Sequence, residues 1–360
     1  MTPPGARGVI RNALLGGTVA VVMLSLLYGV AELGLRAREW GRLAVDRHYP
    51  TGYFTHDAFG MAKPAPGQWH VVTTDVATGR PVYDVQYTVD SFGRRVTPVS
   101  NAGARDRFAL FFGCSYTYGE GLQDDQTLAH DVAEIATRYR PYNYAFHGGG
   151  PFEALARMEN LDFKTEVTEK SGVGFYLFID DHVRRVINSS RIASWHSSEI
   201  HYTQTGDGTF VRDGSFADAR PWQTWLYRFV FNQRVLRYLG IELPLKTTSQ
   251  HLDLTAAVLG EVAKRFKEHF PGSEFYVVIY PGSTWHEPIA RRLERRGVRV
   301  LDYHALFPRN APGYRIDSDG HPTAAAIREL AAAIARELER DDTARALVTT
   351  SAAPIPALAH

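Results

Sequence analysis

From Phe108 to Arg340, short apolar runs alternate with segments in which apolar residues recur every three or four positions. Runs of this length are typical of buried strands, and the spacing between them is typical of amphipathic helices. Strands that alternate with helices form parallel sheets covered on both faces, so the pattern predicts an α/β fold with a central parallel sheet. The expected strands are residues 108–112, 142–146, 173–179, 275–280 and 298–303, and the expected helices are residues 127–139, 151–163, 254–269, 285–296 and 322–340.

The amino terminus has a different pattern, because no residue from Asn12 to Ala31 is charged. At a rise of about 1.5 Å per residue, such a stretch forms a helix of about 30 Å, the thickness of a bilayer's hydrocarbon core. It predicts a transmembrane helix that is retained as a signal anchor. Two alternatives remain: a signal peptide cleaved after the small residues Gly29 to Ala31, and a buried core helix, which would carry polar residues on one face. Arg7 and Arg11 before the stretch favour an extracytoplasmic position for the rest of the chain, although arginines also follow it, at positions 36, 38 and 42.

Between this anchor and the α/β region, residues 69–74 and 83–89 are rich in Val, Tyr and Thr and predict a small β-hairpin unit. A long insertion after the third expected strand contains many aromatic side chains. We expect most of them to pack the insertion onto the body, and the rest hint at stacking on a sugar. The expected organisation is therefore a membrane anchor at 1–45, a small β-rich unit at 46–104, an α/β domain at 105–340 with the insertion at about 184–250, and a flexible tail at 341–360.

The charge balance and the single cysteine narrow the classes of function. With 40 Lys and Arg against 39 Asp and Glu, the net charge of +1 supplies no field for a polyanion, so no nucleic-acid partner is expected. Cys114 is the only cysteine and cannot form an intrachain disulfide or a cysteine-rich zinc site. His196, His201 and Glu199 lack the spacing of a metal-binding motif, so neither a metal site nor another cofactor is expected.

Candidate chemistry gathers in three segments, two that follow expected strands and one that precedes the last helix. In the first, a strand runs into Ser115, which lies between glycines, and the turn lifts its hydroxyl above the sheet. In the second, Gly148 to Gly150 follow a strand and expose backbone N–H groups that favour an anion or a developing oxyanion. In the third, Asp317, Asp319 and His321 share one loop, where a carboxylate can hold the tautomer of the imidazole.

In this order and spacing, the three segments resemble the SGNH or GDSL hydrolase superfamily, in particular its membrane-anchored bacterial members and the related alginate-type acetyltransferases. The resemblance covers about Phe108 to Arg340 and implies a flavodoxin-like three-layer sandwich. Its first motif is Gly113-Cys114-Ser115-Tyr116-Thr117-Tyr118-Gly119, with a cysteine where the family usually has aspartate. The resemblance implies that Ser115 is the nucleophile, that His321 is the general base, and that the N–H groups of Ser115 and Gly148 form an oxyanion hole.

Two positions depart from the family's pattern. Family members usually place aspartate three residues before the histidine, where this chain has serine, so the resemblance implies Asp319 as the orienting acid and Asp317 as its substitute. The oxyanion-hole asparagine that usually follows the third strand is replaced by Asp180-Asp181-His182. An ionised aspartate cannot donate a hydrogen bond. Either Asp180 or Asp181 is protonated in the oxyanion hole, or His182 is the donor, or the third donor is missing; a loop salt-bridged to the arginines that follow it is the structural alternative.

The function implied by the resemblance is that of an exported, membrane-tethered serine esterase acting on O-acyl groups, in particular acetyl groups, of a carbohydrate or related ester. Two alternatives use the same fold. One is an O-acyltransferase that takes the acyl group from a membrane acyl-donor protein and passes it to a sugar hydroxyl. The other is a non-catalytic carbohydrate-binding or scaffold protein. In each case the membrane is a partner through the N-terminal helix, and the main domain is periplasmic or otherwise extracytoplasmic.

Overall fold

Five parallel strands form the central sheet in the order β12-β11-β8-β6-β7, as seen in a computed structural model that describes residues 4–39, 45–57, 59–308 and 311–351. The two halves of this sheet diverge between β6 and β8, and ligands of such sheets bind at the carboxyl ends of the strands at this switch point. The α/β class and the parallel sheet predicted from the sequence are confirmed. The strands are β6 (Arg107–Phe112), β7 (Tyr139–Asn143), β8 (Gly172–Phe178), β11 (Glu274–Ile279) and β12 (Arg299–Asp302).

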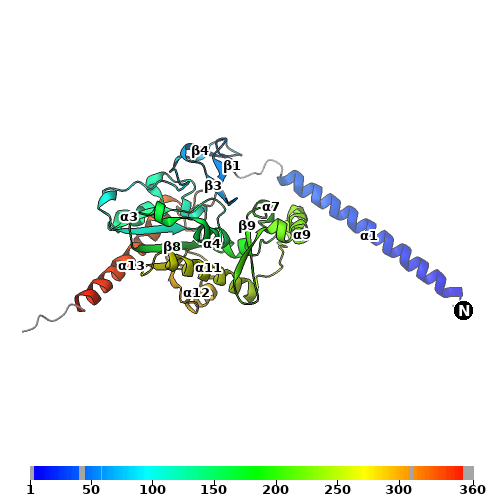
Figure 1. Ribbon diagram of the computed structural model, residues 1–360. Helices are drawn as coiled ribbons and strands as arrows, with labels where there is room; N and C mark the ends of the chain where they lie inside the picture. The colour runs from blue at the N-terminus through cyan, green and yellow to red at the C-terminus, as the bar shows by residue number, and fades with distance from the viewer. Residues whose placement is uncertain (1–3, 40–44, 58, 309–310, 352–360) are drawn as a thin grey trace, which may run out of the picture.

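Helices cover both faces of the sheet and make three layers (Figure 1). Side chains of β6 point alternately to the two faces, so Leu110 and Phe111 belong to different cores. The core around Leu110 includes Leu155 and Val258 from helices on one face, and the core around Phe111 includes Leu330 from the other face. The helices of the first face are α4 (Pro151–Asn160), α6 (Asp181–Val186), α11 (Ser249–His269) and α12 (His286–Glu294), and those of the second are α3 (Leu128–Ile135) and α13 (Ala324–Ser351).

Several boundaries differ from those predicted: α3 ends at Ile135 rather than at residue 139, and the second strand and the last helix are shifted more. The second strand is residues 139–143 rather than 142–146, because β6 pairs with it only from Tyr139 to Asn143. Residues 144–146 are buried as a loop, so their apolar character reflects burial and not strand pairing. The last helix begins at Ala324 and continues to Ser351, so the predicted flexible tail is helical from 341 to 351, and Asp342 accepts a hydrogen bond of 2.7 Å from Arg107. Residues 352–360 of that predicted tail lie outside the described residues.

The predicted β-hairpin is present and belongs to a larger unit. Strands β4 and β5 pair in antiparallel fashion, and β1 pairs with the free edge of β4. Buried Tyr53, Val71 and Tyr87 of this unit pack against Tyr118 and Phe146 of the α/β domain. The unit therefore lies directly over the carboxyl ends of β6 and β7. Its strands are β1 (Val45–His48), β2 (Phe54–His56), β3 (Ala62–Pro64), β4 (Gly67–Asp75) and β5 (Pro81–Val89).

The insertion after β8 contains a small antiparallel sheet and several helices. Its aromatic side chains are divided in their burial: Tyr227 is buried, whereas Trp222 is 81% and Trp225 is 59% exposed. Trp195 (48%) and Phe229 (50%) are exposed as well, so the expectation that most of the aromatic residues pack inward is wrong. The elements are β9 (Ile200–Gln204), β10 (Phe210–Ser215), α7 (Ala193–His196), α8 (Phe216–Ala219), α9 (Pro221–Asn232) and α10 (Arg234–Tyr238).

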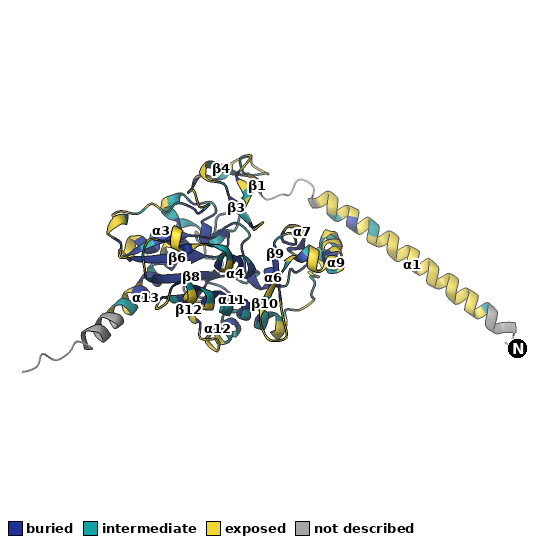
Figure 2. Cartoon of the chain, in the orientation of Figure 1, coloured by how far each residue is buried: buried dark blue, intermediate teal, exposed yellow. Residues whose placement is uncertain are grey.

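The N-terminal helix α1 (Pro4–Glu39) extends away from the rest of the chain and is exposed along most of its length (Figure 2). Its segment Gly8–Arg38 is long and apolar enough to cross a membrane, a property that signal anchors and signal peptides share. Among the described residues of α1, the hydrogen bonds to the body come from its carboxyl end. There the carboxylate of Glu32 accepts hydrogen bonds from the backbone N–H groups of Arg234 (2.9 Å) and Val235 (3.0 Å), which begin α10.

Candidate active site

Ser115 begins a short helix, α2 (Ser115–Tyr118), directly after the turn at the end of β6. The turn needs glycine at 113, because the backbone there has a φ of +144° and a Cβ atom would lie 2.4 Å from Thr117 Oγ1. Ser115 N–H, at the first position of α2, donates to no acceptor in the described part of the chain. The sequence thus places both the hydroxyl and a free backbone donor at the switch point of the sheet.

The three predicted catalytic residues form a hydrogen-bonded chain with the histidine in the middle. Ser115 Oγ is 2.8 Å from His321 Nε2, and His321 Nδ1 is 2.5 Å from Asp319 Oδ1. The Asp319 side chain is inaccessible to solvent, and its other oxygen accepts a hydrogen bond of 2.5 Å from Arg47 of β1. Asp317 is exposed, so the structure brings Asp319 and not Asp317 to the imidazole.

A second carboxylate approaches the imidazole from the opposite side. Glu120 is buried, and its Oε2 lies 2.7 Å from His147 Nδ1 and 3.7 Å from His321 Nε2. Its Oε1 accepts a hydrogen bond of 2.5 Å from the Tyr49 hydroxyl and lies 3.4 Å from Arg47 Nε. Glu120 therefore connects the β-rich unit to the loop that follows Ser115 and adds negative charge beside the catalytic pair.

These charges set the protonation of the site. Burial alone would lower the pKa of His321, but the carboxylates of Glu120 and Asp319 outweigh burial and hold this pKa above its usual value. Burial would raise the pKa of Asp319, but its hydrogen bond to His321 and the Arg47 guanidinium keep that pKa below its usual value. The lowered pKa favours the ionised form of Asp319, and the raised pKa makes His321 a stronger base than a free imidazole.

Glu120→Gln is expected to move the acid limb of the pH–rate profile to lower pH. A general base must be neutral, so activity rises as pH rises through the pKa of His321, and removing the charge 3.7 Å from Nε2 lowers that pKa. The measurement is kcat/KM for p-nitrophenyl acetate from about pH 5 to 9. Tyr49→Phe is the control, because it removes a hydrogen bond to Glu120 but leaves the charge. An unmoved limb in Glu120→Gln would contradict this influence of Glu120 on His321.

The glycine-rich loop after β7 is held closely against the turn and helix that carry Ser115. Asn143 Nδ2 donates to the carbonyl of Thr117 at 3.1 Å, which ties the end of β7 to α2. Gly149 has no room for a side chain, since a Cβ atom would lie 2.7 Å from the Gly113 carbonyl oxygen. Gly148 lies close to Trp195, since a Cβ atom there would be 3.1 Å from the ring, and it lines a small separate cavity of about 20 Å³ with Gly113. Its role as an oxyanion donor stays a prediction.

Asp180 holds a neighbouring loop and does not act as the oxyanion-hole donor considered for it in the sequence. Its carboxylate accepts hydrogen bonds from Ser283 Oγ (2.6 Å), from Thr284 N (3.0 Å) and Oγ1 (2.7 Å), and from Trp285 N (3.4 Å). A carboxylate that accepts four hydrogen bonds cannot also be the protonated donor of an oxyanion hole. The oxyanion-hole prediction for Asp180 is therefore not supported, and Asp180 instead fixes the loop between β11 and α12.

The two neighbours of Asp180 are also engaged elsewhere. Asp181 pairs with Arg184 at 2.7 Å. His182 is fully buried with Nδ1 3.0 Å from the Tyr176 hydroxyl, and burial together with the Arg185 charge holds its pKa well below the usual value. Asp181 lines the cavity described next, whereas His182 is not among its lining residues. The salt-bridged loop thus describes this segment better than a third oxyanion donor does.

Ser115 and His321 open into a cavity of about 710 Å³ at the carboxyl ends of β6, β8 and β11. The loop fixed by Asp180 forms one wall, and the loop before α13 forms another. The wall is rich in charged groups, including four arginines. They are Arg184, Arg185, Arg191 and Arg315.

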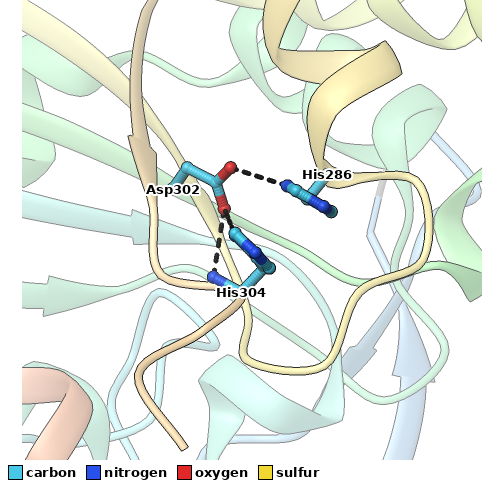
Figure 3. A group of neighbouring side chains, drawn as sticks. All are labelled: His286, Asp302 and His304. Carbon is cyan, nitrogen blue, oxygen red and sulfur yellow. Dashed lines mark hydrogen bonds and ion pairs between the residues drawn. The ribbon is translucent and has the colours of Figure 1, made fainter.

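One cluster in the described part of the chain offers three metal-ligand side chains: His286, Asp302 and His304. Figure 3 shows both imidazoles facing the carboxylate, with Nδ1 of His286 at 2.9 Å and Nδ1 of His304 at 3.1 Å from its oxygens. The rings stack with centroids 3.4 Å apart at 15°. Imidazole binds a metal in the plane of its ring, and two nearly parallel planes do not meet at one ion. These contacts are instead hydrogen bonds that join α12 to the end of β12.

The histidines weighed as metal ligands in the sequence have carboxylate partners of their own. His196 Nε2 lies 3.4 Å from Glu153 Oε1, and His201 Nδ1 lies 2.6 Å from Asp213 Oδ1. Neither belongs to a cluster that could hold a metal ion in the described residues.

Sequence reasoning missed Arg47, Tyr49, Glu120 and His147 as members of the site. Glu120 carried a signal, because it is a lone charge in the glycine-flanked loop that follows Ser115. Arg47 carried none: its bond to Asp319 joins residues 272 positions apart.

No family model matches the chain, and no curated protein matches it. Solved structures do resemble it. A protein described as belonging to the G-D-S-L lipolytic family, from Desulfitobacterium hafniense, has 10% identity and a TM-score of 0.34 over 64% of this chain and 98% of its own. Another G-D-S-L lipolytic family member, from Veillonella parvula, has 10% identity and a TM-score of 0.36 over 63% of this chain and 95% of its own.

An acetyl xylan esterase from the rumen bacterium Butyrivibrio proteoclasticus has 10% identity and a TM-score of 0.39 over 68% of this chain. This chain spans 65% of that esterase's length. The G-D-S-L resemblance expected from the motifs thus has counterparts among solved structures. At TM-scores below 0.5, these counterparts carry no argument about the function of this chain.

Proposed function

We propose that the chain is a serine esterase that hydrolyses O-acyl groups, in particular acetyl groups, of a carbohydrate or related ester. The observation that carries the proposal is the hydrogen-bonded order Ser115, His321, Asp319 at the mouth of an open cavity. A buried serine hydroxyl on a histidine that is oriented by a solvent-inaccessible carboxylate is the arrangement that activates a nucleophile. A scaffold protein has no need to keep it.

The reaction follows from these positions. Ser115 Oγ attacks the acyl carbonyl carbon while His321 Nε2 accepts the hydroxyl proton, and Asp319 stabilises the imidazolium through Nδ1–H. The N–H groups of Ser115 and Gly148 would hold the oxyanion. His321 then returns the proton to the departing alcohol oxygen, which leaves the acyl group on Ser115. Water, deprotonated by His321, attacks the acyl carbon, the bond between that carbon and Ser115 Oγ breaks, and His321 returns the proton to Oγ as the carboxylic acid leaves.

Without a side-chain donor after β8, the oxyanion hole would have two backbone donors. Loss of one donor costs about 10²- to 10³-fold in turnover in other serine hydrolases. Ester hydrolysis by this chain is therefore expected to be slow. An oxyanion hole with two donors favours esters as substrates, because amides are more stable to hydrolysis than esters are.

A fluorophosphonate probe is expected to label the protein covalently at Ser115, and p-nitrophenyl acetate is expected to be hydrolysed. Ser115→Ala should remove both signals, because no other hydroxyl in the described chain is bonded to His321. Ser318→Ala is the matched control, since Ser318 lies three residues before His321 but bonds to Asp75. The labelled peptide is identified by mass spectrometry. Labelling that persists in Ser115→Ala would refute the assignment.

The proposed protein is held at a membrane by α1, with the α/β domain on the extracytoplasmic side. The long apolar helix and the arginines before it support this position.

A further inference from the structure

The cavity beside Ser115 is lined by four arginines and three aspartates, and most of the arginines are not in ion pairs with these aspartates. Asp180 is occupied by the loop at residues 283–285, and Asp181 pairs with Arg184. Asp319 pairs with Arg47, which lies outside the cavity wall, and with His321. Three arginines of the wall therefore have no carboxylate within ion-pair distance in the described part of the chain: Arg185, Arg191 and Arg315.

Arg185 is the most unusual of the three, because it is buried with only 7% of its surface exposed. Its Nη1 donates to the Gly149 carbonyl, and its guanidinium lies over the Trp195 ring, 5.6 Å from the centroid. Its buried Nε has no hydrogen-bond partner. Burying a guanidinium without an ion-paired carboxylate is unfavourable for folding, so its retention beside the cavity is consistent with an anionic partner that arrives with a ligand.

Arg315 and Arg191 approach the cavity from other elements. Arg315 Nη2 donates to the Tyr116 hydroxyl at 3.1 Å, which places this guanidinium beside the residue that follows Ser115. Arg191 is exposed and forms no ion pair or side-chain hydrogen bond with the described residues. Guanidinium groups bind carboxylate and phosphate oxygens through paired hydrogen bonds, and neutral ligands gain much less from them.

We infer that the cavity binds an anionic group of the substrate, a carboxylate or a phosphate, next to the ester that Ser115 attacks. This inference rests on the proposed esterase function and names its substrate class: acyl esters of acidic sugars or of similar anionic alcohols. Arg315 and Arg191 act as specificity residues, and Arg185 adds fixed positive charge at the back of the cavity.

The test compares three acetyl esters on one sugar frame: O-acetylated methyl glucoside, O-acetylated methyl glucuronoside, and the O-acetylated 6-phosphate of the glucoside. For the full-length protein in detergent, kcat/KM for at least one anionic ester is expected to exceed that for the neutral ester by about tenfold or more. The preference should shrink as salt screens the charges. Whether the glucuronoside or the phosphate is preferred identifies the anion. Equal rates on all three esters, or a preference for the neutral one, would overturn the inference.

Arg191→Ala and Arg315→Ala are each expected to lower the ratio of anionic to neutral kcat/KM by about tenfold. Arg295→Ala is the matched control, because Arg295 is an exposed arginine that does not line the cavity. A ratio that falls equally in Arg295→Ala, or that is unchanged in both cavity variants, would contradict the assignment.

A binding measurement separates this inference from the esterase proposal. In Ser115→Ala, methyl glucuronoside or glucose 6-phosphate is expected to raise the thermal unfolding temperature more than methyl glucoside does, because only the bound state is stabilised. This result without any fluorophosphonate labelling of the native chain would keep the anion site and refute the esterase. If the native chain is labelled and hydrolyses esters, but neither anion raises the unfolding temperature of Ser115→Ala, the esterase proposal stands and the anion site is refuted.

Discussion

Asp319→Asn is expected to lower kcat by about 10⁴-fold while the fold stays intact. The buried Asp319 carboxylate lies 2.5 Å from His321 Nδ1 and fixes the tautomer in which Nε2 can accept the serine proton. An asparagine amide can turn its NH₂ toward Nδ1, which favours the wrong tautomer, and it no longer stabilises the imidazolium. The measurement is steady-state hydrolysis of p-nitrophenyl acetate, with thermal unfolding as the test of fold.

Asp317→Asn supplies the control for this prediction, because Asp317 lies two residues earlier in the same loop and is exposed. Its turnover should stay within a few-fold of the native value. If Asp317→Asn is the damaging change and Asp319→Asn is mild, the loop adopts another arrangement in solution and the hydrogen-bonded order at the cavity is not the working one.

The native full-length chain is expected to remain in the membrane pellet after carbonate extraction, and the double change Val21→Arg and Leu24→Arg is expected to release it. Each arginine near the centre of a membrane-spanning helix costs roughly 2.5–3.5 kcal/mol of insertion free energy. Both positions lie on the exposed surface of α1, at 63% and 66% exposure. Protease added to intact spheroplasts should digest the α/β domain of the native chain.

Val211→Arg is the control for this change, since Val211 is an exposed apolar residue of β10, far along the chain from α1. It should stay in the membrane pellet. Extraction of the native chain by carbonate would refute the anchor, and protection of the α/β domain in spheroplasts would place that domain in the cytoplasm.

The strands and the order of the site along them could be predicted because they depend on local patterns. A buried parallel strand such as β6 is a continuous apolar run, and the residues just after such strands meet at one edge of the sheet. Ser115 was therefore within reach of sequence reasoning, whereas His321 was identified from the Asp-x-His motif before the last helix. The shifted β7 was not, because strand pairing with β6 and burial in a loop leave the same apolar signature at residues 142–146.

The role of Asp180 could not be predicted from local sequence patterns, because it depends on polar partners that lie far away in the sequence. An aspartate that follows a buried strand is equally suited to a reacting group or to a neighbouring loop, and the choice depends on Ser283 and Thr284, which arrive from the next strand. Glu120 is a similar case, because its partners Tyr49 and His147 come from separate parts of the chain. Long-range polar partners have no periodicity in sequence.

The contact between Glu32 and the start of α10 has a consequence for where the enzyme would work. In the proposed anchored protein, the uncharged stretch ends at Ala31, so α10 and the adjoining α9 would lie at the height of the lipid headgroups. The exposed Trp222 and Trp225 of α9 are side chains that favour this zone. The anchor would then fix the distance between Ser115 and the bilayer. Only ester groups presented at that distance from the membrane could reach Ser115.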